Sequence, residues 1–298
     1  MFTNHVGEFA ALLTAVFWTI TAMAFEVATK RVGAYSVNVI RLFFAFILLA
    51  ILNFFRRGLM LPLDASAHAW IWLSVSGVVG FIMGDLFLFA SYPIITSRVS
   101  MLIMTLAPPL AAFIGWIVLG ETMTALSLLG MVLVVFGIGI TIWRRPDSGK
   151  KLSLNFPVKG LLFALLGAVG QAVGLVLSKY GMRDYDPFAA TQIRIIAGLI
   201  GFGFIISILR RWKNVFRVFS DSKSLSRIGL GSFFGPFLGV SFSLIAVQHT
   251  SAGIAATLMS IVPVLIIIPS VIIFKQKVSF REVVGAVISV AGVALFFI

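Results

Sequence analysis

The stretch GFIMGDLF at Gly80–Phe87 recurs as GPFLGVSF at Gly235–Phe242, with both glycines and the closing phenylalanine kept. The same shift of 155 positions (235 minus 80) aligns further helix-special residues: Pro108 with Pro263, Gly130 with Gly285, and Gly137 with Gly292. Nearer the N-terminus a shift of 153 positions (194 minus 41) aligns others: Gly7 with Gly160, Leu13 with Leu166, and Arg41 with Arg194. Internal repetition of two hydrophobic halves is typical of membrane transporters.

The composition is that of an integral membrane protein. Hydrophobic residues make up 60% of the chain, charged residues 11%, and the mean hydropathy is +1.10, whereas soluble proteins carry roughly a quarter charged residues. The chain has no cysteine, which excludes disulfides and thiol chemistry. The net charge of +13 is attributed to membrane topology and not to a nucleic-acid partner, because the positive charges lie between the apolar runs.

Ten apolar runs are long enough to cross the hydrocarbon core, which takes about 20 helical residues. The first is expected to be a mature span, because MFTNHVGEF has neither a basic n-region nor a cleavage site. The predicted spans are 7–29, 36–55, 69–91, 96–119, 124–143, 158–181, 187–209, 227–247, 251–274 and 280–298. Tyr92–Ile95, Gly120–Met123 and Gln248–Thr250 are predicted tight turns, and the basic, amphipathic stretch 210–226 is expected to lie along the headgroups.

Five spans per half is an odd number, so the second half enters the membrane in the opposite sense. We therefore predict an all-α fold of ten transmembrane helices in two inverted five-helix repeats, 1–143 and 158–298, joined by a basic linker at 144–157. Substrate is expected between the repeats, near the membrane midplane. The apolar surface predicts a lipid bilayer as partner, in a cell inner membrane or plasma membrane, for a monomer or homodimer.

Lysine and arginine are distributed unequally between the two sides that these spans define. Seventeen lie in connections opposite the termini, whereas four, Arg56, Arg57, Lys179 and Arg183, lie on the side of the termini. The positive-inside rule then places both termini outside.

The segment GDLFLFASYPIITSRVSMLIMTLAPPLAAFIGWIVLGE (Gly84–Glu121) with LLGMVLVVFGIGI (Leu128–Ile140), and its echo in Ser251–Gln276 and Gly285–Phe297, resemble the EamA family of the drug/metabolite transporter superfamily. The features that this chain shares with the family, in the same order along the sequence, are a Gly-Asp pair, a mid-helix proline, a Gly-Glu pair and a closing helix with regularly spaced glycines. The second half departs from it, with Lys275 and Gln276 where the first half has Gly-Glu.

The resemblance covers nearly the whole chain and implies a ten-helix transporter of small metabolites. The transport activity that it implies is export of amino acids or of aromatic or amphipathic compounds. It also implies cytoplasmic termini, against the charge count, so the orientation stays open. The alternatives are a membrane-embedded enzyme or lipid-handling protein, and a structural subunit. No HExxH, Walker loop or His cluster is present in the sequence, so no metal, cofactor or ATP-driven cycle is expected.

Ionisable residues within spans are functional candidates, because their insertion costs at least about 2.5–3.5 kcal/mol at a helix centre. Asp85 is the clearest, either as a proton-coupling acid or as a packing residue bonded to Arg41. Glu26 aligns with Lys179, and the pair marks the substrate path or snorkels near helix ends. Arg41 and Arg194 align with each other, and they either capture a substrate anion or reach the headgroups.

Uncharged polar residues add four candidates for the substrate path. Trp18 and its repeat equivalent Gln171 are central in their spans, where they could stack on and hydrogen-bond to a solute. Ser241 and Ser243 place hydroxyls in the eighth span. For Trp18 and Gln171 the alternative is that they are ordinary buried residues.

The positions of glycine and proline predict where helices pack closely and where they bend. Three Gly-x-x-x-Gly pairs are expected to let helices approach closely: Gly80 with Gly84, Gly170 with Gly174, and Gly235 with Gly239. Pro108 and Pro263 each remove a backbone donor in mid-span, and they act either as hinges for alternating access or as static bends.

Overall fold

The computed structural model of the chain describes residues 5–119, 125–144, 153–249, 255 and 258–295. The regular elements among them are helices, apart from one pair of two-residue antiparallel strands, β1 (Trp143–Arg144) and β2 (Ser153–Leu154). The helices before this pair are α1 (Val6–Val32), α2 (Ala34–Arg57), α3 (Ala67–Gly77), η2 (Val78–Asp85), α4 (Leu86–Ile103), η3 (Met104–Leu106), α5 (Ala107–Leu119) and α6 (Ala125–Ile142).

The chain after the strand pair forms both long helices and several short ones. They are α7 (Val158–Met182), α8 (Pro187–Ile208), α9 (Trp212–Arg217), η4 (Val218–Ser220), α10 (Ser222–Ser232), η5 (Phe233–Gly239), α11 (Val240–His249), α13 (Val262–Leu265), α14 (Ile267–Ile272) and α15 (Phe280–Leu295).

Six helical stretches of the described chain are long and apolar enough to cross a membrane: Val6–Val32, Ala34–Arg57, Ala67–Ile114, Val158–Met182, Pro187–Ile208 and Ser222–His249. Shorter apolar helices cover Leu128–Thr141 and Val262–Ile272. The membrane-protein class read from the composition is thereby supported by helix length as well. Ala67–Ile114 has 48 residues, about twice the length that one crossing needs.

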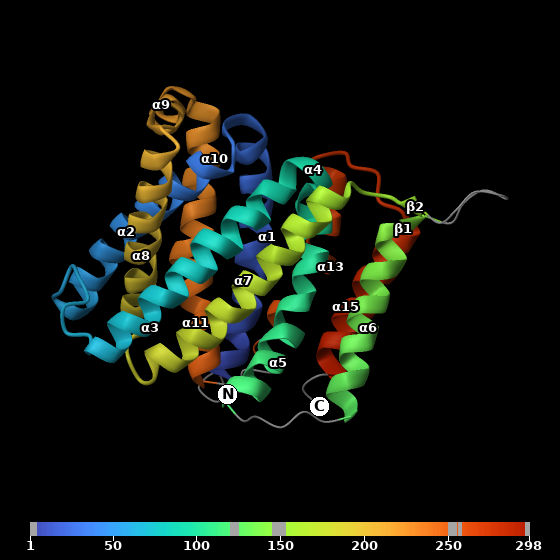
Figure 1. The fold of residues 1–298 in the computed structure, drawn as a ribbon, viewed down its shortest axis with the longest axis horizontal. Coiled ribbons are helices and arrows are strands. Elements are labelled where there is room, and N and C mark those ends of the chain that lie inside the picture. The colour runs from blue at the N-terminus through green and yellow to red at the C-terminus, as the bar shows by residue number, and fades with distance from the viewer. Residues whose placement is uncertain (1–4, 120–124, 145–152, 250–254, 256–257, 296–298) are drawn as a thin grey trace.

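The long stretch is broken at one residue. Thr96 has φ 67° and ψ 158°, which is not helical, and the chain reverses direction there (Figure 1). The predicted turn at Tyr92–Ile95 was therefore misplaced, because these residues still belong to α4. The predicted turn Gly120–Met123 lies outside the described residues, and Gln248–Thr250 does so in part.

Two π-helical segments lie at corresponding places in the two halves. Segment η2 spans Val78–Asp85 and η5 spans Phe233–Gly239, so their first residues are 155 positions apart (233 minus 78), the repeat shift of the sequence. Both contain a Gly-x-x-x-Gly pair. A π turn widens the helix and is frequent at functional sites.

The helices pack as pairs drawn from the two halves. Helix α2 packs on α8, α6 on α15, α1 on α10 and α11, and α7 on α3, η2 and α4. In Figure 1, α1 begins and α15 ends at one end of the bundle, whereas α9, the α1–α2 connection and the strand pair lie at the opposite end. Segments far apart in sequence are thus neighbours throughout the bundle.

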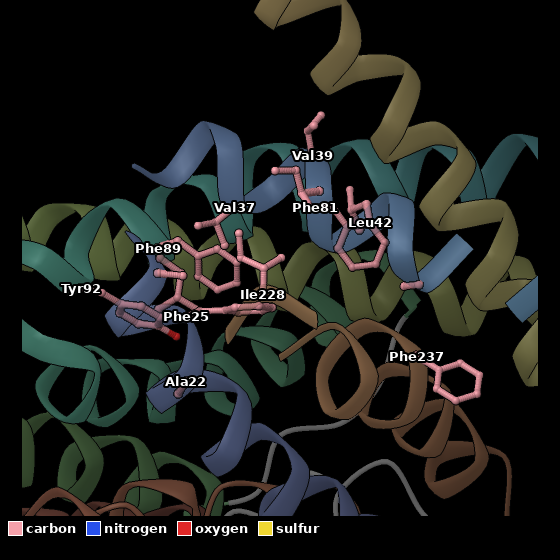
Figure 2. Packing of buried hydrophobic residues seen from close by; sticks show 14 of the residues in the cluster. Ala22, Phe25, Val37, Val39, Leu42, Phe81, Phe89, Tyr92, Ile228 and Phe237 are labelled. Carbon is pink, nitrogen blue, oxygen red and sulfur yellow. The ribbon is translucent and has the colours of Figure 1, made fainter. Parts of the chain in front are cut away.

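The interior is an aromatic and aliphatic core, and the outside is also apolar. Phe25, Phe89 and Tyr92 lie together in Figure 2, with ring centroids 5.0 Å apart for Phe25 and Phe89 and 5.4 Å apart for Phe89 and Tyr92. On the outer face of α8, Ile200 is 70% and Phe204 67% exposed. Such exposure would be costly in water and fits the surface of a membrane-spanning helix.

The basic stretch 210–226 contains two short helices and the start of a longer one. Helix α10 starts after Asp221, whose carboxylate accepts from the Ser224 hydroxyl at 2.8 Å and the Ser224 amide at 3.2 Å, and pairs with Arg31 at 3.0 Å. The Ser224 hydrogen bonds, followed by Arg31, lower the pKa of Asp221 to about 2. This capped, ion-paired junction ties α1 to α10.

Candidate functional site

A cavity of about 160 Å³ lies between the two halves of the bundle. Its wall comes from α1, α2, η2, α4, η3 and α5 on one side and α7, α8, η5, α11 and α13 on the other. Most of the polar candidates predicted from the sequence lie on this wall: Trp18, Arg41, Asp85, Gln171, Arg194 and Ser243.

Asp85 is the centre of a hydrogen-bond network that joins three helices. Its Oδ2 accepts from Arg41 Nη2 on α2 at 2.5 Å, and its Oδ1 accepts from Gln171 Nε2 on α7 at 2.5 Å. The Arg41 Nε in turn donates to Asn38 Oδ1 at 3.0 Å. Both carboxylate oxygens are therefore occupied, and the structure realises the Asp85–Arg41 contact that the sequence left as one of two alternatives.

Arg41 is buried with this partner. Its side chain does not reach a helix end, because the residue is 2% exposed, so the headgroup alternative fails for it. Its guanidinium carbon lies 4.8 Å from the Phe89 ring centroid, 5.4 Å from that of Phe81 and 5.8 Å from that of Phe25. These are favourable cation–π distances, so an ion pair and three rings hold Arg41.

Arg194 occupies the matching place on α8 but has different surroundings. It is 4% exposed, and its guanidinium carbon lies 5.0 Å from the centroid of the Phe81 ring. Its buried Nε has no hydrogen-bond partner among the described residues. The headgroup alternative fails here too, and Arg194 faces the cavity without an acceptor from the described chain.

The glycine pairs allow close contact between the cavity helices. A Cβ atom added at Gly170 would lie 2.6 Å from Cα of Gly84, and one added at Gly174 would lie 3.0 Å from Cα of Gly80. In the other half, a Cβ at Gly235 would lie 2.7 Å from the Thr21 Cγ2 atom. Contacts this short exclude a side chain, so α7 and η2 meet backbone to backbone.

Trp18 and Gln171 hold equivalent positions in the structure as well as in the sequence. A Cβ at Gly239 would lie 2.8 Å from Trp18 Nε1, and a Cβ at Gly84 would lie 3.1 Å from Gln171 Nε2. Each therefore lies against the second glycine of a π segment, and both line the cavity. The same backbone frame thus presents an indole on one side and an amide on the other.

Pro108 and Pro263 also border the cavity, each beside an interruption of its helix. The 3₁₀ turn η3 precedes α5, which contains Pro108, and Pro263 is in the first turn of the short helix α13. Proline has no N–H to donate, which is why helices restart at these points.

Glu26 belongs to a second cluster, away from the cavity wall. It is 2% exposed and accepts from the Ser97 amide at 2.9 Å and the Ser97 hydroxyl at 2.5 Å, just after the break at Thr96. Lys30 pairs with it at 2.5 Å, and Gln276 donates to it at 3.4 Å. Glu26 thus caps the helix that starts at Ser97 and ties it to α1.

A nearby ion pair closes the same end of the molecule. Arg98 Nη2 lies 2.7 Å from Glu282 Oε2 and 3.4 Å from the Lys277 carbonyl oxygen. The contact joins the helix after Thr96 to α15. Together with the Glu26 cluster, it links elements of both halves at this end of the molecule.

Of the remaining candidates, Lys179 and Ser241 are separate from the cavity, and Ser243 lines it. Lys179 is exposed near the end of α7, so the structure does not bring it to Glu26. Ser241 is fully buried, and its hydroxyl has no hydrogen-bond partner among the described residues. Ser243 lines the cavity but donates to the Val240 carbonyl oxygen at 2.7 Å.

Several cavity residues were not foreseen from the sequence. Phe81, Phe89, Tyr92, Met101 and Met104 line the wall, but aromatic and methionine side chains are too frequent in this chain to single out. Asn38 could have been found, because an amide one helical turn before Arg41 is unusual in an apolar run. Among the described residues there is no group of three or more acidic or histidine side chains that could hold a metal.

A polytopic helical bundle that encloses a charged cavity between two halves defines the class of solute-transporting membrane proteins. The chain belongs to the EamA-like transporter family, whose model matches residues 5–143 and 158–298. It is therefore a multi-pass membrane transporter and not an enzyme, as the resemblance implied.

The chain is similar over nearly its whole length to proteins named as transporters. An uncharacterized transporter of Archaeoglobus fulgidus is 23% identical over 97% of this chain and 96% of its own. The uncharacterized transporter YyaM of Bacillus subtilis is 25% identical over 97% of this chain and 93% of its own. Human solute carrier family 35 member G1 is 25% identical over 96% of this chain and 77% of its own.

A solved crystal structure has the same fold. It superimposes with a TM-score of 0.63 at 16% sequence identity, over 97% of this chain and 95% of that chain. At this identity the likeness concerns the fold alone.

Proposed function

We propose that this chain is a secondary transporter that moves a small organic metabolite by alternating access. Ten membrane helices would form two inverted five-helix repeats, 1–143 and 158–298, with the basic stretch 144–157 as linker. The observation that carries the proposal is the cavity between the halves, whose wall holds Asp85, bonded to Arg41 and Gln171. A structural subunit would have no use for such a buried polar cavity, because buried charges reduce stability unless they are paired.

Contacts across the bundle support the repeat layout. A Cβ at Gly285 would lie 2.5 Å from the Gly137 carbonyl oxygen, and a Cβ at Gly292 would lie 2.8 Å from that of Gly130. Under the 155-position shift these two contacts exchange with each other, as a two-fold axis between α6 and α15 requires. The matched segments η2 and η5 and the pair α2–α8 obey the same relation.

The mechanism follows from the interruptions and from the contacts at one end. The 3₁₀ turn before α5 and the short helix α13 give each half a point of bending next to the cavity. The Glu26 and Arg98–Glu282 clusters join the halves at the end near Thr96. Opening that end requires both clusters to separate, while the opposite end closes over the cavity.

The proposed substrates are amino acids or aromatic and amphipathic compounds, and the proposed direction of transport is export. Proton coupling through Asp85 or Glu26 is one form of the mechanism, and exchange or facilitated diffusion is the other. YhbE of Escherichia coli, 28% identical over 46% of this chain, is named an inner membrane transporter, which supports location in a cell inner or plasma membrane. The proposed unit is a monomer or homodimer.

The test is flux into proteoliposomes that contain the purified chain, with counterflow of labelled phenylalanine and benzoate across an imposed pH gradient. Asp85→Asn should lose flux or its pH dependence, whereas Asp184→Asn, an exposed loop change, should match the wild type. Full and still pH-dependent flux in Asp85→Asn would end the coupling role of Asp85. Absence of counterflow for every probe in the wild type would overturn the transport proposal itself.

A further inference from the structure

The cavity wall carries an unbalanced positive charge. Among the described residues that line it, the charged ones are Arg41, Asp85 and Arg194, two cations against one anion. Arg41 and Asp85 neutralise each other through their direct contact. Arg194 is left as a guanidinium 4% exposed on a membrane-buried wall. An unpaired charge in such a place carries a large desolvation penalty.

The surroundings of Arg194 reduce this penalty only in part. Asp85 attracts the guanidinium electrostatically, but this carboxylate makes its hydrogen bonds to Arg41 and Gln171. The Phe81 ring at 5.0 Å also attracts the guanidinium, but a cation–π contact brings no negative charge and accepts few of the five N–H donors. Glu26, the other deeply buried acid of the described chain, is engaged with Lys30 and Ser97. The cavity therefore offers a positive group whose donors lack an acceptor from the described chain.

The rest of the wall is suited to an apolar body of limited size. Leu88, Phe89, Met101, Met104 and Met259 contribute aliphatic, aromatic and thioether surface. The cavity volume of about 160 Å³ is close to that of an engineered apolar cavity of about 150 Å³ that binds benzene. Adaptable methionine side chains tolerate ligands of varied outline.

We infer that Arg194 binds the anionic group of the transported solute, which is an organic monoanion with an apolar body about one aromatic ring in size. This inference rests on the proposed transport function. A carboxylate matches the planar fork of the guanidinium and can accept two parallel hydrogen bonds. An amine would find Asp85, the one acid among the described residues of this wall, already bonded to Arg41 and Gln171. Binding of a single negative charge neutralises the wall.

The first experiment compares three probes of one size and different charge on the purified full chain: benzoate, benzamide and benzylamine. A ligand that binds only the folded state raises the unfolding temperature, and at a fixed concentration the rise grows as its Kd falls. Benzoate should raise it, whereas benzamide and benzylamine should leave it unchanged. Sodium chloride at the same concentration separates an inorganic anion site from an organic one, and equal stabilisation by chloride would overturn the inference.

The second experiment changes the arginine. Arg194→Gln should weaken benzoate binding by roughly 10- to 100-fold, the range expected for charge-assisted hydrogen bonds. Arg194→Lys should retain the preference for benzoate over benzamide at reduced affinity. Arg227→Gln removes an exposed arginine of α10 and should bind benzoate like the wild type. Wild-type benzoate affinity in Arg194→Gln would overturn the inference even if the site binds anions.

Counterflow separates this inference from the function on which it rests. Flux of phenylalanine or benzylamine at the same rate as benzoate would leave transport standing and refute the anion preference. Loss of benzoate flux in Arg194→Gln, with retained flux in Arg227→Gln, is the expected result.

Discussion

Arg41 and Arg194 are both arginines at equivalent positions of the two halves, yet their side chains have different hydrogen-bond partners. Arg41 contacts Asp85 and Asn38, whereas Arg194 has no acceptor for its Nε among the described residues. Removal of Arg41 leaves a buried carboxylate without its cation, while removal of Arg194 leaves nothing unpaired. Stability should respond to the two changes in different directions.

We expect Arg41→Gln to lower the free energy of unfolding by about 3–5 kcal/mol, the range for breaking one partner out of a buried ion pair. Arg194→Gln should leave the ligand-free protein as stable as the wild type or more stable. The measurement is unfolding of both variants in one detergent, followed by circular dichroism. Equal losses in the two variants would show that Arg194 also has a buried partner.

Single residues were only partly predictable from the sequence. Asp85, Arg41 and Arg194 stand out because charge within an apolar run is expensive, and all three line the cavity. Glu26 and Lys179 satisfied the same criterion but lie elsewhere. The free-energy cost of inserting a charged residue does not indicate which other residues it contacts in the fold. The apolar wall carries no sequence signal of its own, since lipid-facing and cavity-facing side chains have the same composition.

At the scale of elements, the contact of α7 with η2 depends on glycine on both sides. A Cβ at Gly170 would lie 2.6 Å from both Cα and N of Gly84, and a rigid backbone cannot move aside as a side chain can. On α8, by contrast, a Cβ at Gly203 would meet nothing within 4 Å. The two positions therefore form a matched pair for substitution.

Gly170→Ala should destabilise the protein by about 1–3 kcal/mol through overpacking and should reduce flux, because Asp85 and Gln171 lie on the two helices that would separate. Gly203→Ala should be neutral or should stabilise by up to about 1 kcal/mol through helix propensity. Thermal unfolding of the two variants decides the matter. A Gly170→Ala protein as stable as Gly203→Ala would contradict the close contact.

Helix existence was predictable, and helix interruptions were not. The apolar runs predicted the long helices to within a few residues at most ends, because roughly 20 apolar residues have few alternatives in a membrane. The predicted span 251–274 is an exception, because its described part contains the two short helices α13 and α14. The reversal at Thr96 depends on Glu26, which lies 71 positions away along the chain from Ser97 and caps its amide. The π segments likewise depend on close contacts with α7 and α1, which no local sequence pattern contains.

At the scale of the whole molecule, one end of the bundle is basic. Lys30 and Arg31 end α1, and Arg210, Arg211 and Lys213 border α9, at the end opposite to the start of α1 (Figure 1). The other end carries far fewer basic residues in the described chain, among them Arg56 and Arg57 at the end of α2.

The positive-inside rule predicts that the basic end faces the cytoplasm. Because the natural chain has no cysteine, single substitutions give unambiguous labels. Lys213→Cys should react with an impermeant maleimide only after cells are opened, and Arg183→Cys should react in intact cells. The reverse pattern would support the cytoplasmic termini implied by the family resemblance.

The contact between α6 and α15 has a further consequence under the proposed repeat. Ser289 donates to the Val134 carbonyl oxygen at 3.3 Å, and these two residues are 155 positions apart, so they are copies of one ancestral site that touch each other. In a dimer of two identical halves, any substitution at that site would have faced itself across the axis. A valine opposite a serine is closed to two identical halves and open to one chain that carries both, so under the proposed repeat the two surfaces of this contact can change independently.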